Sequence, residues 1–193
     1  AGGAGLVKTL LALGEGMLPP SANFETPGRE IDLASSRLRV LKEPETWPRR
    51  RDGAVRRAAV SGFGFGGINA HVVLEEWREP ARGRAAVSVR LPKGEARQDE
   101  TAAIAIIGMA AHVGPWRNLN AVATRLFRDD ESTPTMPEGW WGHAAAEQFR
   151  GYFIKSLDVP LAAYRIPPAE LGDMLPQQLL MMEVARAAMF DAG

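Results

Sequence analysis

Four glycines and two phenylalanines alternate in one short stretch of this sequence, GFGFGG. The glycines are Gly62, Gly64, Gly66 and Gly67. Glycine adopts positive φ without steric cost and lets another group approach the backbone closely, so such a turn suits a place where main-chain N–H groups face something bound. Phe63 and Phe65 are poor choices for a solvent loop. We therefore expect at least one of these rings to fill a core or to gate a pocket.

Strand-like runs flank this turn and must position it. Residues 58–61 form a short apolar run, and residues 68–74 carry several β-branched side chains. The pattern predicts a hairpin, and most glycine-rich hairpins have no further role. The stretch also satisfies G-x-G-x-x-G, but the dinucleotide fingerprint needs a helix after its glycines. Because INAHVVLEE is typical of a strand, we take that match as accidental.

The composition excludes several classes of function. The chain has 193 residues, 46% of them hydrophobic, and 23 basic residues balance 23 acidic ones. Zero net charge argues against a nucleic-acid or membrane-surface partner, and no apolar run approaches the roughly 20 residues of a membrane span. We expect no targeting signal and a cytoplasmic location. The absence of cysteine excludes disulfides, thiolate metal sites and a cysteine nucleophile.

The first part of the chain combines a helical pattern with a polar region. Residues 1–13 have apolar positions on helical spacing, which predicts a mostly buried helix that ends near Gly14 and Gly16. Residues 21–51 are polar and rich in proline, and only 38–41 has the pattern of a short strand.

The pattern restarts after residues 80–100, whose composition of charge, glycine and proline predicts a linker, with one short strand expected at 86–91. Residues 102–109 form a continuous apolar run of strand length. Residues 118–128 have the spacing of an amphipathic helix.

Two further sets of residues are candidates for sites. The three histidines lie in no metal-ligand spacing, so we expect structural or surface roles for His71, His112 and His143. Four methionines recur at the C-terminal end, and they suit either a core or a dimer interface. They are Met174, Met181, Met182 and Met189.

GFGFGGINAHVVLEE resembles the C-terminal hairpin of the β-ketoacyl synthase family, the condensing enzymes of polyketide and fatty acid synthases, whose usual form is S-x-F-G-F-G-G-T-N-A-H-V-V-L-E. The resemblance implies that Phe65 gates the acyl pocket and that its backbone N–H contributes to the oxyanion hole. Ile68 replaces the threonine of the family and removes a hydroxyl group. The substrate-pocket gate and oxyanion turn implied in this way consist of Phe63, Gly64, Phe65, Gly66, Gly67 and Asn69.

Other segments are similar to opposite ends of the same family. AGGAGLVK resembles the segment after the second catalytic histidine, so the resemblance implies that the chain starts beyond that histidine. IAIIGMAA resembles the first strand of a condensing domain, and MLPQQLLMMEVA resembles its M-D-P-Q-Q-R-L-L-L-E-V-A segment. Leu175 and Leu179 replace the aspartate and the arginine of that pattern. These departures resemble the chain-length-factor half of polyunsaturated-fatty-acid-type synthases.

The resemblance implies an α/β, thiolase-like fold with layers α-β-α, present as incomplete pieces of two domains. Residues 1–77 would be the C-terminal part of a ketosynthase-like domain, 78–101 a linker, and 102–193 the N-terminal part of a second ketosynthase-like or chain-length-factor domain. The parent would condense acyl and malonyl thioesters by decarboxylative Claisen condensation, while this segment alone would be inactive. The alternative is a non-catalytic interaction or dimerisation module.

The implied partners are acyl carrier protein, other domains of the synthase, and a homodimeric or ketosynthase-like heterodimeric pairing. No cofactor or metal is expected to bind directly, because the phosphopantetheine of a carrier protein would serve as the substrate arm. A local basic cluster, Arg49, Arg50, Arg51, Arg56 and Arg57, precedes the hairpin. It is interpreted first as a solvated loop, with a docking surface for an acidic carrier protein as the alternative.

Overall fold

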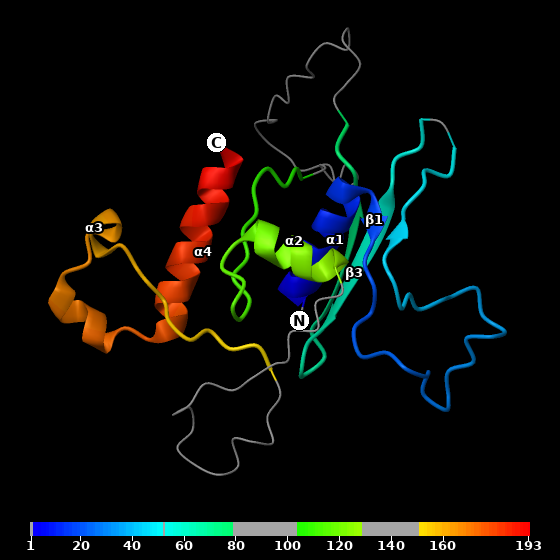
Figure 1. Cartoon of the computed structure of the whole chain (residues 1–193), viewed down its shortest axis with the longest axis horizontal. Helices are drawn as coiled ribbons and strands as arrows, with labels where there is room; N and C mark the ends of the chain where they lie inside the picture. The colour runs from blue at the N-terminus through cyan, green and yellow to red at the C-terminus, as the bar shows by residue number, and fades with distance from the viewer. Residues whose placement is uncertain (1, 52, 79–103, 129–150) are drawn as a thin grey trace, which may run out of the picture.

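The computed structural model describes residues 2–51, 53–78, 104–128 and 151–193 as a small mixed α/β arrangement (Figure 1). Its helices and strands are α1 (Gly2–Glu15), β1 (Met17–Leu18), β2 (Glu45–Thr46), β3 (Arg57–Phe63), β4 (Asn69–Glu75), α2 (Leu119–Phe127), α3 (Leu161–Tyr164), the 3-10 helix η2 (Pro168–Asp173) and α4 (Pro176–Ala192). In these residues β1 pairs with β2 and β3 with β4, each antiparallel. The layered thiolase-like architecture and the domain boundaries stay predictions.

Helix α1 forms where its pattern predicted and supplies most of the buried apolar side chains of the described residues, but the helix is not mostly buried. Leu11, Ala12 and Leu13 are buried in its last turns. The helix is followed by Gly16, whose φ of +64° favours glycine and turns the chain into β1. Lys8 Nζ donates a hydrogen bond of 2.8 Å to the carbonyl oxygen of Pro20, which holds the chain after β1 against the helix.

The hairpin of β3 and β4 lies against α1, and its predicted strands are confirmed (Figure 1). Along β3, exposed and half-buried residues alternate, as expected when one face of a strand is covered. The covered face is the one toward α1, since a Cβ on Gly5 of the helix would lie 3.4 Å from Val60 Cγ1. The other face of the hairpin is open, and Val73 there is 66% exposed.

The predictions of two strands, at residues 38–41 and 102–109, are wrong for the residues that the structure describes. Residues 38–41 form no strand, and Leu38 is exposed. Residues 104–109 have no regular secondary structure and pair with no strand in the described part of the chain. Only their last two residues contact α4: the Met109 N–H donates to Asp191 Oδ2 at 2.9 Å, and a Cβ on Gly108 would lie 2.5 Å from the carbonyl oxygen of Ala188. Residues 104–107 are exposed. Residues 102 and 103 and the strand expected at 86–91 fall outside the described residues.

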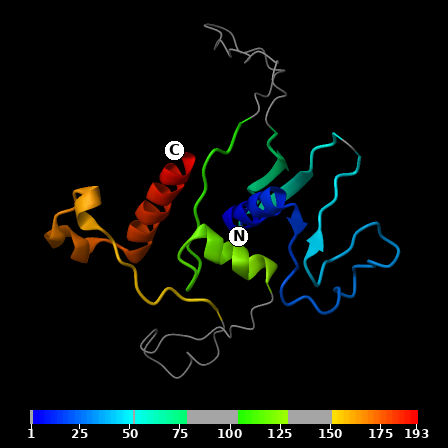
Figure 2. The same ribbon diagram turned by 45° about the horizontal axis from the view of Figure 1, so that its top comes forward.

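Helix α2 confirms the amphipathic pattern of residues 118–128. Asn118 is its N-cap, and its Oδ1 accepts the Ala121 N–H at 2.9 Å. Val122 is buried. Figure 2 shows α1 and α2 between the hairpin and α4, so the C-terminal helix stands away from the glycine turn.

Helix α4 is held to α3 by a phenol. The Tyr164 hydroxyl donates to Glu183 Oε1 at 2.6 Å and accepts from Arg186 Nε at 3.0 Å. Of the four methionines, Met181 and Met189 are 68% and 76% exposed, so the core interpretation is wrong for these two. The dimer-interface interpretation stays a prediction. No helix in the described residues is long and apolar enough to cross a membrane.

Candidate functional site: the glycine turn

The tip of the hairpin is a defined β-turn. The Gly67 N–H donates to the carbonyl oxygen of Gly64 at 3.2 Å, and the Gly64 N–H donates to the carbonyl oxygen of Ile68 at 2.7 Å. Phe65 is the second residue of this turn, and Gly66 is the third, with φ of +99°. A type II turn requires positive φ at its third position, which glycine adopts most readily. The glycines therefore fix the backbone on which Phe65 is mounted.

Three of the glycines in the turn meet separate structural demands. Gly66 and Gly67 have φ of +99° and +90°, where side chains cause strain. Gly64 has an ordinary φ, but a Cβ there would lie 2.6 Å from the carbonyl oxygen of Ile68. The backbone of residue 64 must approach Ile68 this closely because the two share the hydrogen bond that closes the loop. The sequence composition of the turn thus follows from its geometry.

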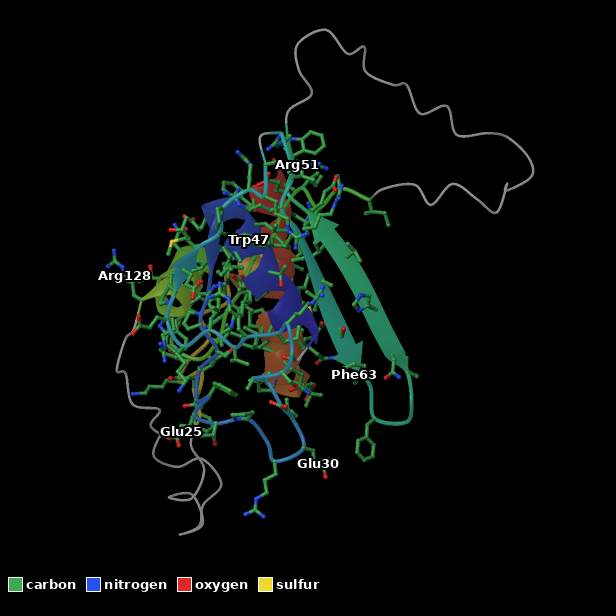
Figure 3. The ribbon with its side chains drawn as sticks, turned by 90° about the vertical axis from the view of Figure 1, so that its right-hand side faces the viewer. Glu25, Glu30, Trp47, Arg51, Phe63 and Arg128 are labelled. Atoms are coloured by element: carbon green, nitrogen blue, oxygen red, sulfur yellow. The ribbon has the colours of Figure 1, made fainter. Side chains whose placement is uncertain are left out.

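The apolar side chains of the turn project into solvent. The Phe65 side chain is fully exposed, and Phe63 and Ile68 are 81% and 82% exposed. Figure 3 shows Phe63 at the end of the hairpin opposite to Arg51. Neither phenylalanine fills a core in the described residues, so that part of the expectation is wrong. The expectation that Phe65 gates a pocket stays a prediction.

The turn also presents unused backbone donors. Within the described part of the chain, the N–H groups of Phe65 and Gly66 donate to no acceptor. Asn69 lies opposite Phe63 in the register of the hairpin, and its side chain is exposed. An exposed N–H on a rigid turn costs no rearrangement when an anion or a developing oxyanion approaches it. The arrangement can therefore act as a hydrogen-bond donor beside a large apolar ring.

A separate hollow of about 300 Å³ lies between residues 109–112 and α4. Met109, Val184 and Phe190 are among the residues that line it, and no residue of the hairpin does. The buried Nε2 of His112, another lining residue, has no hydrogen-bond partner in the described residues. This hollow lies apart from the turn, so it is not the pocket that Phe65 is expected to gate.

The two described histidines lie in different surroundings. His71 is exposed and its Nδ1 lies 2.8 Å from the Ser61 hydroxyl across the two strands, a surface role. His112 contributes to the wall of the hollow, and His143 falls outside the described residues. In the described residues no three histidine or acidic side chains are grouped so that they could hold a metal ion.

The base of the hairpin carries an ion cluster that the sequence did not reveal. Glu76, only 9% exposed, follows β4 directly. Arg49, Arg56 and Arg78 surround its carboxylate. The hydrogen bond from Arg49, helped by the one from Arg56, lowers the pKa of Glu76 from 4.5 to about 2. The carboxylate therefore stays ionised wherever the chain is folded near neutral pH.

This cluster corrects the interpretation of the basic residues before the hairpin as a solvated loop. Arg49 and Arg56 bind Glu76, and Arg57 pairs with Glu75 at 2.8 Å on the surface. Arg50 and Arg51 are exposed and form no ion pair with a described residue. Docking of an acidic carrier protein to this surface stays a prediction.

The sequence of the chain matches the model of a known protein family. Residues 27–136, more than half of the chain, match the model of the ketoacyl-synthetase C-terminal extension. The match contains the whole β3–β4 hairpin and continues across both expected domain boundaries.

The chain is also similar to segments of several large synthases. It is 31% identical over 206 aligned positions to a polyunsaturated fatty acid synthase chain of Thraustochytrium sp., covering 100% of this chain and 10% of that protein. It is 46% identical over 76 residues to the pikromycin polyketide synthase component PikAIII of Streptomyces venezuelae, covering 39% of this chain and 5% of that protein. Over 103 residues it is 44% identical to a phenolphthiocerol/phthiocerol polyketide synthase chain of Mycobacterium tuberculosis, covering 51% of this chain and 5% of that protein. The chain thus spans about a tenth or less of the length of each of these three relatives.

Proposed function

Because the chain belongs to the ketoacyl-synthetase C-terminal extension family, we propose that it works as part of a multidomain synthase and that its glycine turn borders the acyl pocket of a condensing domain. Family membership confirms the resemblance seen in the sequence. The reaction proposed for the whole synthase is the decarboxylative Claisen condensation of acyl and malonyl thioesters. The relatives that carry this proposal are named as polyketide and polyunsaturated fatty acid synthases.

The observation that carries the proposal is the position of Phe65. A fully exposed aromatic ring at the corner of a rigid turn is costly in water, so it is best explained by a surface that covers it in the working assembly. The ring can change rotamer without moving β3 or β4, because the glycines hold the backbone independently of the side chain. That is the mechanical requirement for a gate.

The backbone donors fit the same reaction. Attack on a thioester places negative charge on the carbonyl oxygen, and preorganised N–H groups stabilise that charge. The Phe65 N–H has no acceptor among the described residues and lies beside the ring that would enclose the acyl chain. We assign it the role of an oxyanion donor, with Gly64, Gly66 and Gly67 holding the turn and with Phe63 and Asn69 flanking it.

The nucleophile belongs elsewhere in the proposed assembly. The chain contains no cysteine, so it supplies no thiolate to carry the acyl group. The thioesters would reach the site on the phosphopantetheine arm of an acyl carrier protein. The finer proposal is a thiolase-like fold divided at residues 77/78 and 101/102, with the second piece belonging to a ketosynthase-like or chain-length-factor domain. The proposed assembly pairs condensing domains as homodimers or as ketosynthase-like heterodimers.

A non-catalytic interaction or dimerisation module is the second candidate, and the open apolar face of the hairpin favours it. Phe63, Phe65, Ile68 and Val73 are all exposed there. A part of a condensing domain should self-associate or unfold at low denaturant when purified, since its strand edges are unpaired. A monodisperse monomer with a cooperative unfolding transition supports an independent interaction module instead, and a discrete dimer with such a transition supports the dimerisation module.

The experiment that tests the proposal is a graft. Residues 57–75 replace the corresponding hairpin of an active β-ketoacyl synthase, and condensation is measured with its own acyl and malonyl carrier proteins. We expect the graft to retain condensation activity. Substitution of Phe65 in the graft should abolish that activity, and substitution of Phe63 should change it little. A graft that folds with the melting temperature of its host but condenses equally well without the Phe65 ring contradicts the gate.

A further inference from the structure

The chain leaves the hairpin through a charged residue that is buried. Among the described residues Glu76 is the buried charged side chain, with 9% of its surface exposed, and it comes directly after the last residue of β4. A buried carboxylate is unfavourable unless charged or hydrogen-bonding partners surround it. Its partners therefore indicate what the site holds together.

Three arginines surround this carboxylate. Arg49 Nε lies 2.9 Å from Oε1, Arg56 Nη1 lies 2.6 Å from Oε2, and Arg78 Nε lies 3.5 Å from Oε1. The backbone N–H of Glu76 also donates to the carbonyl oxygen of Arg56 at 3.0 Å. One carboxylate thus neutralises part of a group of three positive charges, and without it the guanidinium groups would repel one another.

Two of these arginines, Arg56 and Arg78, also bind backbone carbonyl groups of a segment that we call the strap, residues 47–51 and 53–56. Arg56 Nε donates to the carbonyl oxygen of Trp47 at 2.7 Å. Arg78 Nη1 and Nη2 donate to the carbonyl oxygens of Gly53 and Ala54, each at 3.0 Å. In both Arg56 and Arg78, some nitrogens of the guanidinium group bind carbonyl oxygens of the strap while another nitrogen contacts the Glu76 carboxylate.

We propose that Glu76 is a carboxylate latch that fastens the strap to the exit of β4, so that the strap and the base of the hairpin open and close as one unit. Arg78 lies two residues after Glu76 and reaches back to the strap, which fixes the direction in which the chain departs from the hairpin. Arg56 also connects this cluster to the end of α1, because its guanidinium group packs against Gly16, the residue that follows the helix. The latch is independent of the role of the glycine turn.

A direct consequence is that a small carboxylate can replace the missing side chain. Glu76→Gly removes the carboxylate and leaves room between the three guanidinium groups. Formate should enter that space, since it presents the two oxygens that the arginines bind. Glu76→Gln keeps the shape but removes the charge, and Glu75→Gln is the matched control because, among the described residues, Glu75 pairs only with Arg57 on the surface.

The test is hydrogen exchange followed by mass spectrometry on the full chain. We expect Glu76→Gln and Glu76→Gly to lose protection in peptides from the strap and from the end of β4 together, while α2 and the Glu75→Gln control keep theirs. Formate should restore protection in Glu76→Gly, and chloride at equal ionic strength should not. Arg78→Gln serves if Glu76→Gly does not fold, because it leaves the carboxylate two partners and releases only the Gly53 and Ala54 carbonyl groups.

Either of two results overturns the proposal. One is a strap that keeps its protection in both Glu76→Gln and Arg78→Gln. The other is a loss of protection at the end of β4 while the strap is unchanged, which means that the two segments open separately.

Discussion

Arg56 Nη1 lies 2.6 Å from Glu76 Oε2, and this contact joins the residue before β3 to the residue after β4. It closes the base of the hairpin, whose tip is the exposed turn that carries Phe65. The backbone bond from Glu76 to Arg56 lies beside it. The hairpin is thus fixed at one end and free at the other, as a device that inserts a turn into another surface needs to be.

The first prediction concerns acid. The pKa of Glu76 falls to about 2, chiefly because Arg49 and Arg56 hydrogen-bond its carboxylate, whereas in the unfolded chain it returns to about 4.5. A lowered pKa contributes stability that is present above the unfolded value and is lost as the pH falls toward the folded value. Urea midpoints should therefore decline from about pH 4.5 toward pH 2. Glu76→Gln should show a smaller decline, and an identical decline in both proteins contradicts the assignment.

The second prediction compares two glycines at the end of α1. Gly16 has φ of +64°, and a Cβ there would lie 2.9 Å from Arg56 Nη2. Gly16→Ala should lower stability by roughly 1–2 kcal/mol from the backbone alone. Gly14 lies inside the helix with nothing within 4 Å of an added Cβ. Gly14→Ala should raise stability by roughly 0.5–1 kcal/mol, and thermal melts that move both variants in the same direction refute this geometry.

The third prediction separates the backbone of the turn from its ring. Gly64→Ala should loosen the hairpin, because its Cβ would lie 2.6 Å from the carbonyl oxygen of Ile68. Phe65→Ala should change the stability of this chain by no more than about 0.5 kcal/mol, since the ring is fully exposed. Gly28→Ala is the control, because an added Cβ at Gly28 meets nothing within 4 Å. A loss of roughly 3–5 kcal/mol in Phe65→Ala would instead identify the ring as core.

The fourth prediction is that this polypeptide alone does not condense acyl thioesters. It has no cysteine to accept the acyl group. Incubation with acyl and malonyl carrier proteins should yield no condensation product and no carbon dioxide above that of a heat-killed sample. Reproducible release of carbon dioxide shows that the segment carries catalytic groups of its own.

Local patterns predicted the elements that local interactions determine. The hairpin follows from two short apolar runs and the glycines between them, and α2 follows from its spacing and from the cap at Asn118. The strands expected at 38–41 and 102–109 required partners elsewhere in the chain, and the described residues offer none. An apolar run specifies that it should be covered but not what covers it: here Gly108 and Met109 contact α4, and residues 104–107 are exposed.

The candidate site was predicted in part for the same reason. The glycines identified the turn, because positive φ values and close contacts with residues nearby in the sequence are local features that glycine allows. The Glu76 cluster joins residues that are 20 and 27 positions apart, and no spacing rule pairs them. The signal in the sequence was a group of arginines before β3 and the adjacent Glu75 and Glu76 at the end of the hairpin, which does not determine which charge is buried.

The measurement that tests the central claim most directly uses two ringless variants of the grafted hairpin. Phe65→Ala removes the ring and keeps the N–H, whereas Phe65→Pro removes both and suits the second position of a type II turn. The gate predicts altered acyl loading in both variants at an unchanged melting temperature. The oxyanion role predicts a further loss of condensation rate in Phe65→Pro, roughly 10²–10³-fold relative to Phe65→Ala. Normal loading and equal condensation rates in two folded variants would contradict the account.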